Sequence, residues 1–117
     1  MTSYNCRETL EAYSADLKNI LAEILRQIRK KLRMDETEMT VLLEGKQAMG
    51  FNYYPPCPQP EQVIGLPPHS DFGGITSLLE VNGVQGLQIK KDGLWIPVKS
   101  LPNAFIINIG DALEVYL

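Results

Sequence analysis

Residues 75–98 have the sequence ITSLLEVNGVQGLQIKKDGLWIPV, in which short β-prone runs alternate with turn signals. The first run, 75–81, ends in an Asn-Gly pair at 82–83, a dipeptide typical of β-hairpins. The next run alternates in polarity up to an Asp-Gly pair at 92–93, after which the chain returns as a further strand. The pattern predicts a meander of short antiparallel strands.

Downstream of the meander, residues 104–109 are apolar enough to predict a strand buried on both faces, and a turn is expected at Gly110-Asp111. No closing strand is expected between this turn and Leu117, so one edge of the sheet would stay open. Open apolar sheet edges recruit other chains, so we expect self-association through those edges.

Upstream of the meander, residues 7–33 carry apolar side chains at spacings of three and four, which predicts one long helix with a single apolar stripe. Asn5 followed by Glu8 predicts a capping pair at its start. Asp35 followed by Glu38 predicts the start of a second, shorter helix.

Gly45 is expected to end that second helix. Because the helices precede the strands, the predicted class is α+β, with the strands forming a fragment of a β-sandwich or barrel. The predicted division is a helical segment, 1–46, followed by a β-rich segment, 47–117.

The connection between helices and strands is unusual in composition. Residues 49–54 are aromatic and strand-like, whereas 55–60 contain prolines that exclude a helix and lack ladder donors. A stiff connector between two strands is favoured over a PxxP ligand for a partner domain.

The overall charge and the N-terminal residues limit which partners and which location are expected. The formal net charge is −3, so no global basic surface indicates nucleic acid or an anionic membrane as partner. Basic residues near the end of the first helix are typical of a solvated face beside the negative end of the helix dipole. No signal-peptide pattern or membrane-length apolar run is evident, and Cys6 and Cys57 are typical of reduced thiols, so a cytoplasmic location is expected.

The only histidine in the sequence is His69, and a carboxylate, Asp71, follows two positions later. On an extended segment, residues two apart point to the same face, so the pair would present imidazole and carboxylate to one small volume. Non-haem Fe(II) sites use two histidines and one carboxylate, and this pair would supply one of those histidines and the carboxylate. Because metal ligands come in clusters of three or four, the pair alone is also compatible with an ordinary loop histidine.

Several motifs together resemble the plant iron(II)- and 2-oxoglutarate-dependent dioxygenases, a family similar to isopenicillin N synthase. The matching residues occur in the family's order: RETLEAY at 7–13, NYYPPCPQPE at 52–61, His69-Ser70-Asp71, GLQI at 86–89, GLW at 93–95 and NIGD at 108–111. The resemblance implies that the strands belong to an incomplete double-stranded β-helix, or jelly roll, preceded by the long and the short helix.

The same resemblance implies functional residues. His69 and Asp71 match the first two iron ligands, and Asn52 and Tyr54 match positions that contact 2-oxoglutarate. An amide and a phenol can hydrogen-bond a dicarboxylate, although both residues could instead serve only to fix the proline turn. The complete relatives hydroxylate, demethylate or desaturate small plant metabolites such as flavonoids, alkaloids or hormones.

Two family groups are expected beyond Leu117: the second iron-binding histidine and an arginine that pairs with 2-oxoglutarate. The family's N-terminal region is likewise expected to be missing, which makes the chain a central fragment of the kind that a premature stop or mis-splicing would produce. We therefore expect weak binding of Fe(II) and 2-oxoglutarate and little activity from the chain alone. The alternative is a non-catalytic interaction module whose sheet edge pairs with another chain.

Overall fold

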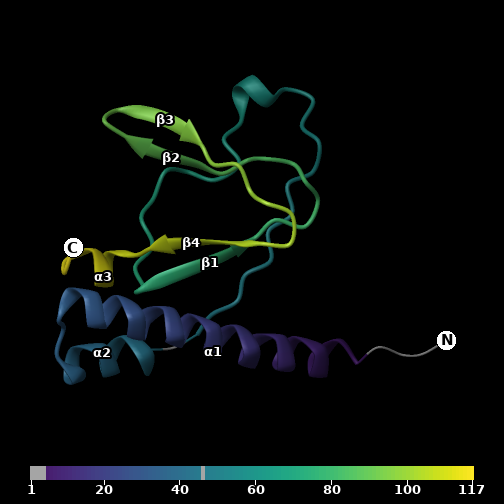
Figure 1. Ribbon diagram of the computed structural model, residues 1–117. Coiled ribbons are helices and arrows are strands. Elements are labelled where there is room, and N and C mark those ends of the chain that lie inside the picture. Colours follow the sequence, from purple (N-terminus) through teal and green to yellow (C-terminus); the bar gives the residue numbers. More distant parts are fainter. Residues whose placement is uncertain (1–4, 46) are drawn as a thin grey trace. The chain divides into compact units, whose positions relative to one another are not determined.

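The computed structural model describes residues 5–45 and 47–117 and separates into two compact units. One unit extends to Ser70 and includes Tyr116–Leu117, and the other is Asp71–Val115. Figure 1 shows helices and an extended segment in the first unit and short strands in the second. The class is α+β, as the order of patterns in the sequence predicts.

The long helix α1, Cys6–Leu32, forms where the three-and-four spacing of apolar residues predicts it. It ends at Arg33, whose left-handed backbone (φ 56°) turns the next N–H, that of Met34, back to the Arg29 carbonyl at 3.3 Å. The predicted capping pair at its start is wrong. The Asn5 side chain makes no cap hydrogen bond, although its backbone carbonyl accepts the N–H of Thr9 at 3.1 Å as in an ordinary helix start.

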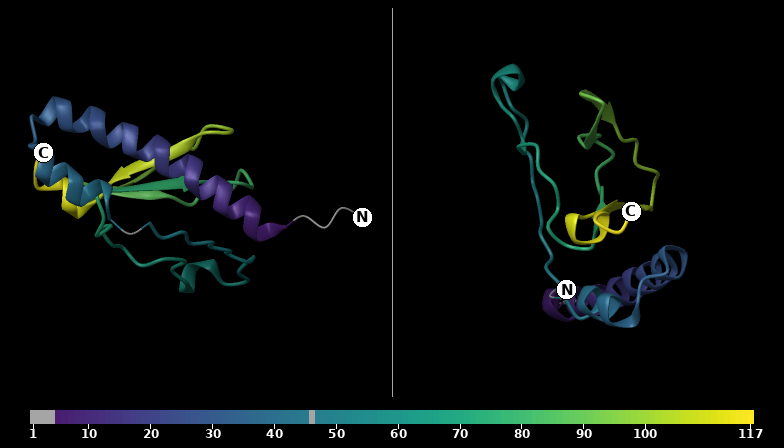
Figure 2. Two further views of the ribbon diagram at one scale, coloured as in Figure 1. Left: turned by 90° about the horizontal axis from the view of Figure 1, so that it is seen from below. Right: turned by 90° about the vertical axis from the view of Figure 1, so that its left-hand side faces the viewer.

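The short helix α2, Glu36–Leu43, begins with the predicted capping box. The Glu38 N–H donates to the Asp35 carboxylate at 2.8 Å, and the Asp35 N–H donates to the Glu38 carboxylate at 3.2 Å. Helix α2 runs back alongside the C-terminal half of α1 (Figures 1 and 2). Leu25 and Met34 are buried in this unit.

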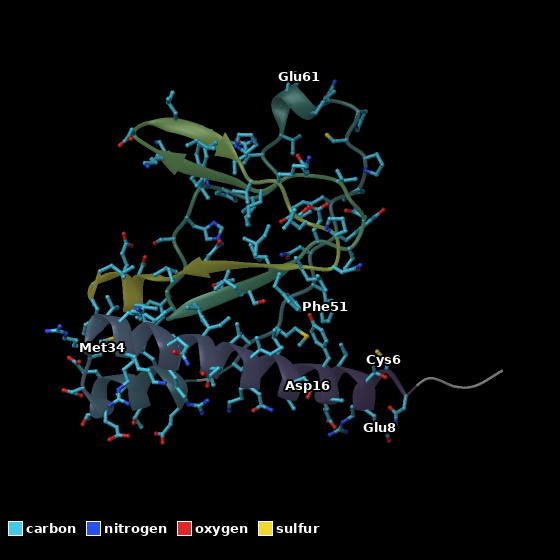
Figure 3. The ribbon with its side chains drawn as sticks, viewed as in Figure 1. Cys6, Glu8, Asp16, Met34, Phe51 and Glu61 are labelled. Atoms are coloured by element: carbon cyan, nitrogen blue, oxygen red, sulfur yellow. The ribbon has the colours of Figure 1, made fainter. Side chains whose placement is uncertain are left out.

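Residues 47–70 form an extended segment, anchored at its start where the Gln47 side-chain amide donates to the Ser14 carbonyl at 3.2 Å. Figure 3 shows Phe51 on the side of α1 that carries Cys6. The strand-like pattern at 49–54 does not form a strand, because no ladder partner pairs with it. A single 3-10 turn, η1 (Pro60–Gln62), interrupts the proline-rich part.

In the second unit, β1 (Ile75–Leu79) pairs antiparallel with β4 (Phe105–Ile109), so that Ile75 faces Ile109 and Leu79 faces Phe105. This differs from the hairpin predicted at residues 82–83. The turn exists, with Gly83 at φ 71°, but the apolar side chains of β4 offer β1 the better cross-strand pairs.

The second predicted hairpin is confirmed: β2 (Gln88–Lys91) pairs with β3 (Leu94–Pro97). Asp92 and Gly93 both have positive φ, 52° and 81°, as a type I′ turn requires. Opposite each other on the two strands, the Lys90 ammonium lies 5.8 Å from the centre of the Trp95 ring.

Strand β4 is not buried on both faces as predicted, since Phe105 and Ile109 at its ends are 36% and 41% exposed. Its one ladder, to β1, covers a single edge among the described strands. After β4 the chain turns at Gly110 into a single helical turn, α3 (Asp111–Glu114), whose Leu113 is fully buried.

Candidate functional site

His69 is exposed and lies outside regular secondary structure, at the end of the proline-rich segment. Its ring atom Nδ1 lies 2.9 Å from the carbonyl oxygen of Pro67. A carbonyl can only accept, so this bond requires the proton on Nδ1. In the neutral ring the lone pair is then on Nε2, the arrangement that metal-binding histidines adopt.

Asp71 is partly buried and is held through its backbone. Its carbonyl accepts the N–H of Asp111, the first residue of α3, at 2.7 Å. The N–H of Ala112 donates to the carbonyl of Gly73 at 3.2 Å. The segment that carries Asp71 is therefore fixed to the start of α3, a contact between residues 40 positions apart that local sequence patterns do not reveal.

The histidine and the carboxylate fall on either side of the boundary between the two units, His69 in the first and Asp71 in the second. Neither residue lies on a strand, so the two-residue spacing does not by itself place their side chains on a common face. Within residues 5–45 and 47–117, no group of three or more His, Cys, Asp or Glu side chains could hold a metal ion.

Of the two predicted 2-oxoglutarate contacts, Asn52 is exposed and Tyr54 is 56% exposed. The Tyr54 ring packs on the backbone of Gly65: a Cβ atom at that glycine would lie 3.3 Å from Cδ1 of the ring. The structure therefore brings the two arms of the proline-rich segment together at Tyr54. The sequence signals this contact only by placing a glycine at position 65.

The arginines lie on or directly after α1, and three of them have local partners. Arg7 pairs with Glu11 at 2.7 Å, Arg26 pairs with Glu23 at 3.3 Å, and the Arg29 side chain donates to the Met34 carbonyl at 3.3 Å. A hydrogen bond from Gln27, with a further one from Arg26, lowers the pKa of the exposed Glu23 carboxyl. These are the pairings of a solvated helix surface.

Comparison with known proteins gives the family. The sequence pattern of the 2OG-Fe(II) oxygenase superfamily matches residues 45–116, more than half of the chain. The chain belongs to this superfamily. Complete members of the superfamily use Fe(II) and 2-oxoglutarate. The match favours an oxygenase origin over the alternative of a non-catalytic interaction module.

Individual relatives come from plants. The chain is 57% identical over 110 residues to oxoglutarate-dependent flavonoid 7-O-demethylase 1 of Ocimum basilicum, covering 93% of the chain and 30% of that protein. It is 51% identical over 113 residues to thebaine 6-O-demethylase of Papaver somniferum, covering 93% of the chain and 31% of that protein. Protein SRG1 of Arabidopsis thaliana is 53% identical over 112 residues, with the same coverage.

This member of the superfamily therefore spans about 30% of the length of the curated relatives it matches. None of its described helices is long and apolar enough to cross a membrane.

Proposed function

We propose that these 117 residues carry part of the active site of an iron(II)- and 2-oxoglutarate-dependent dioxygenase. His69 and Asp71 would bind the metal ion, and Asn52 and Tyr54 would contact 2-oxoglutarate. The observation that carries the proposal is the hydrogen bond between Nδ1 of His69 and the Pro67 carbonyl, because it directs the lone pair to Nε2 in a superfamily whose members use Fe(II).

The donor chemistry fits this metal. A neutral imidazole nitrogen and a carboxylate oxygen both suit Fe(II), which when bound provides the redox chemistry that activates O₂. His69 and Asp71 would hold the ion, and the phenol of Tyr54 and the amide of Asn52 would orient the dicarboxylate. A second histidine ligand would have to come from outside these residues, since the sequence contains one histidine.

The substrate class and the surrounding fold are part of the same proposal. Two of the relatives named above are O-demethylases, which supports a small plant metabolite as substrate and oxidative demethylation, hydroxylation or desaturation as reaction. Residues 47–117 would form the first part of a double-stranded β-helix, with 1–46 preceding it. The match over residues 45–116 supports that division.

Metal binding tests the ligand assignment directly. We expect the chain to bind Mn(II), a redox-inert substitute for Fe(II), weakly, because two protein ligands hold a divalent ion less well than three. His69→Ala and Asp71→Asn should each abolish the binding measured by titration calorimetry. Asp92→Asn, which removes a carboxylate from the β2–β3 turn, is the matched control and should leave binding unchanged.

Tight binding of Mn(II) that persists in His69→Ala would contradict the assignment of His69 as a ligand. Equal losses in Asp71→Asn and Asp92→Asn would show that carboxylate charge in general, and not the predicted pair, attracts the ion.

A further inference from the structure

Three consecutive N–H groups at the start of α3 hold the segment that begins with Asp71. They donate to three carbonyls: Gly110 to Gly74 at 2.9 Å, Asp111 to Asp71 at 2.7 Å and Ala112 to Gly73 at 3.2 Å. The first of these bonds follows directly on the ladder between β1 and β4. The hydrogen bonds that join the strand pair therefore continue to the backbone of Asp71.

Gly110 is the residue that permits this contact. A Cβ atom at position 110 would lie 2.1 Å from the carbonyl oxygen of Gly73 and 2.8 Å from that of Asp71. The backbone of Gly110, with φ −97° and ψ 169°, is open to any amino acid, so the requirement for glycine comes from the close approach and not from the dihedral angles. Any side chain there must push the Asp71 backbone away.

We infer that Gly110 is a positioning residue for the carboxylate of Asp71, acting through the N–H groups of α3. The inference rests on the proposed function, because it takes Asp71 as a metal ligand. Groups that orient a ligand contribute to metal affinity even though they do not touch the ion, and their loss typically costs about 10–100-fold in affinity.

The test compares two glycine-to-alanine variants of the same cluster. Co(II) serves as the probe because it binds nitrogen and oxygen sites more tightly than Fe(II) and shifts the NMR signals of nearby nuclei. Gly110→Ala should lower the affinity for Co(II) by about 10–100-fold. Gly73→Ala is the matched control: its Cβ would meet no atom within 4 Å, so affinity should equal that of the unmodified chain.

A double-mutant cycle separates positioning from a general structural effect. If Gly110→Ala acts by displacing the carboxylate, adding it to Asp71→Asn should cause no loss of Co(II) affinity beyond that of Asp71→Asn alone. If the two losses add, or if Gly110→Ala binds Co(II) as the unmodified chain does, the inference is overturned. Hydrogen exchange should also accelerate at the amides of Asp111 and Ala112 in Gly110→Ala.

Should Gly110→Ala fail to fold, Asp111→Pro gives an independent answer. Proline is accepted at the first position of a helix, and the extended backbone of Gly110 suits a following proline, but the N–H that bonds Asp71 is lost. Compared with Asp111→Ala, which keeps that N–H, the proline variant should bind Co(II) about 10–100-fold less tightly. Equal affinities of these two variants would overturn the inference.

The effect of Asp71→Asn in the otherwise unmodified chain tests the proposed function by itself. If that substitution does not change Co(II) affinity, the ligand assignment fails and the positioning role fails with it. If it does change affinity while Gly110→Ala does not, only the positioning role fails.

Discussion

Gly65 and Tyr54 show how a single residue shapes the candidate co-substrate region. The glycine has no side chain, and the Tyr54 ring occupies the space where a Cβ atom would make contact at 3.3 Å. That separation is tight but not prohibitive, because a ring that is 56% exposed can move by a few tenths of an ångström. The orientation of the phenol therefore depends on the glycine opposite it.

We predict that Gly65→Ala moves the Tyr54 ring, with a change in its aromatic NMR signals and a loss of stability of at most about 1 kcal/mol, at the low end of overpacking costs. Gly50→Ala is the matched control in the same segment, since its Cβ would meet no atom within 4 Å. Unchanged Tyr54 signals in Gly65→Ala would show that the ring does not pack on this glycine in solution.

At the scale of elements, helices α1 and α2 begin in different ways, although each is preceded by a residue suited to capping. Asp35 accepts the Glu38 N–H at 2.8 Å, whereas Asn5 makes no side-chain cap. A side-chain cap accepts a hydrogen bond from a backbone N–H that has no acceptor within the helix. Removing the cap typically lowers stability by about 1 kcal/mol.

We predict that Asp35→Ala lowers the helix content of residues 36–43 and costs about 1 kcal/mol, while Asn5→Ala has little effect. Backbone chemical shifts report each helix separately, and circular dichroism reports the total. A loss of α1 helicity in Asn5→Ala equal to that of α2 in Asp35→Ala would mean that Asn5 caps its helix in solution.

At the scale of the whole molecule, few of the described hydrophobic side chains are buried. Among the side chains that the structure describes, the buried hydrophobic residues are Leu25, Met34 and Leu113. The described strands form two separate two-stranded sheets, and such pairs are marginally stable without further cover. Leu94 and Trp95 on the β2–β3 hairpin are 70% and 46% exposed.

We predict that the 117-residue chain self-associates and unfolds without a sharp transition, because open sheet edges and exposed apolar side chains attract other chains. Analytical ultracentrifugation and calorimetry measure the two properties. The helical circular-dichroism signal of α1 should persist at the same time. A monomer with a single cooperative melt would contradict this prediction and would imply that the exposed side chains find cover within the chain.

Turnover is also a property of the whole molecule. We predict that the 117 residues alone do not convert 2-oxoglutarate to succinate at a rate typical of enzymes, about 1 s⁻¹ or more. The sequence contains one histidine, and its arginines lie on or beside α1, three of them with local partners. A complete relative assayed in parallel is the control, and succinate release by this chain at a comparable rate would contradict the prediction.

The sequence by itself determined the features that depend on neighbours within about four positions. The periodic apolar stripe specifies α1, the Asp35 and Glu38 pair specifies the start of α2, and Asp92 with Gly93 specifies the type I′ turn, because helices, caps and tight turns are local interactions. The motifs around His69 and Asp71 likewise indicate the superfamily, whose sequence pattern matches residues 45–116.

Only the tertiary structure decided which distant segments meet. The sequence favoured pairing of the first strand with its neighbour, yet β1 pairs with β4, since side-chain complementarity between remote strands outweighs the nearby turn. The same pairing places Gly110 against the backbone of Asp71, and the proline-rich segment folds so that Tyr54 meets Gly65. Those contacts join residues far apart in the chain, and their geometry follows from close packing of backbones that local patterns do not encode.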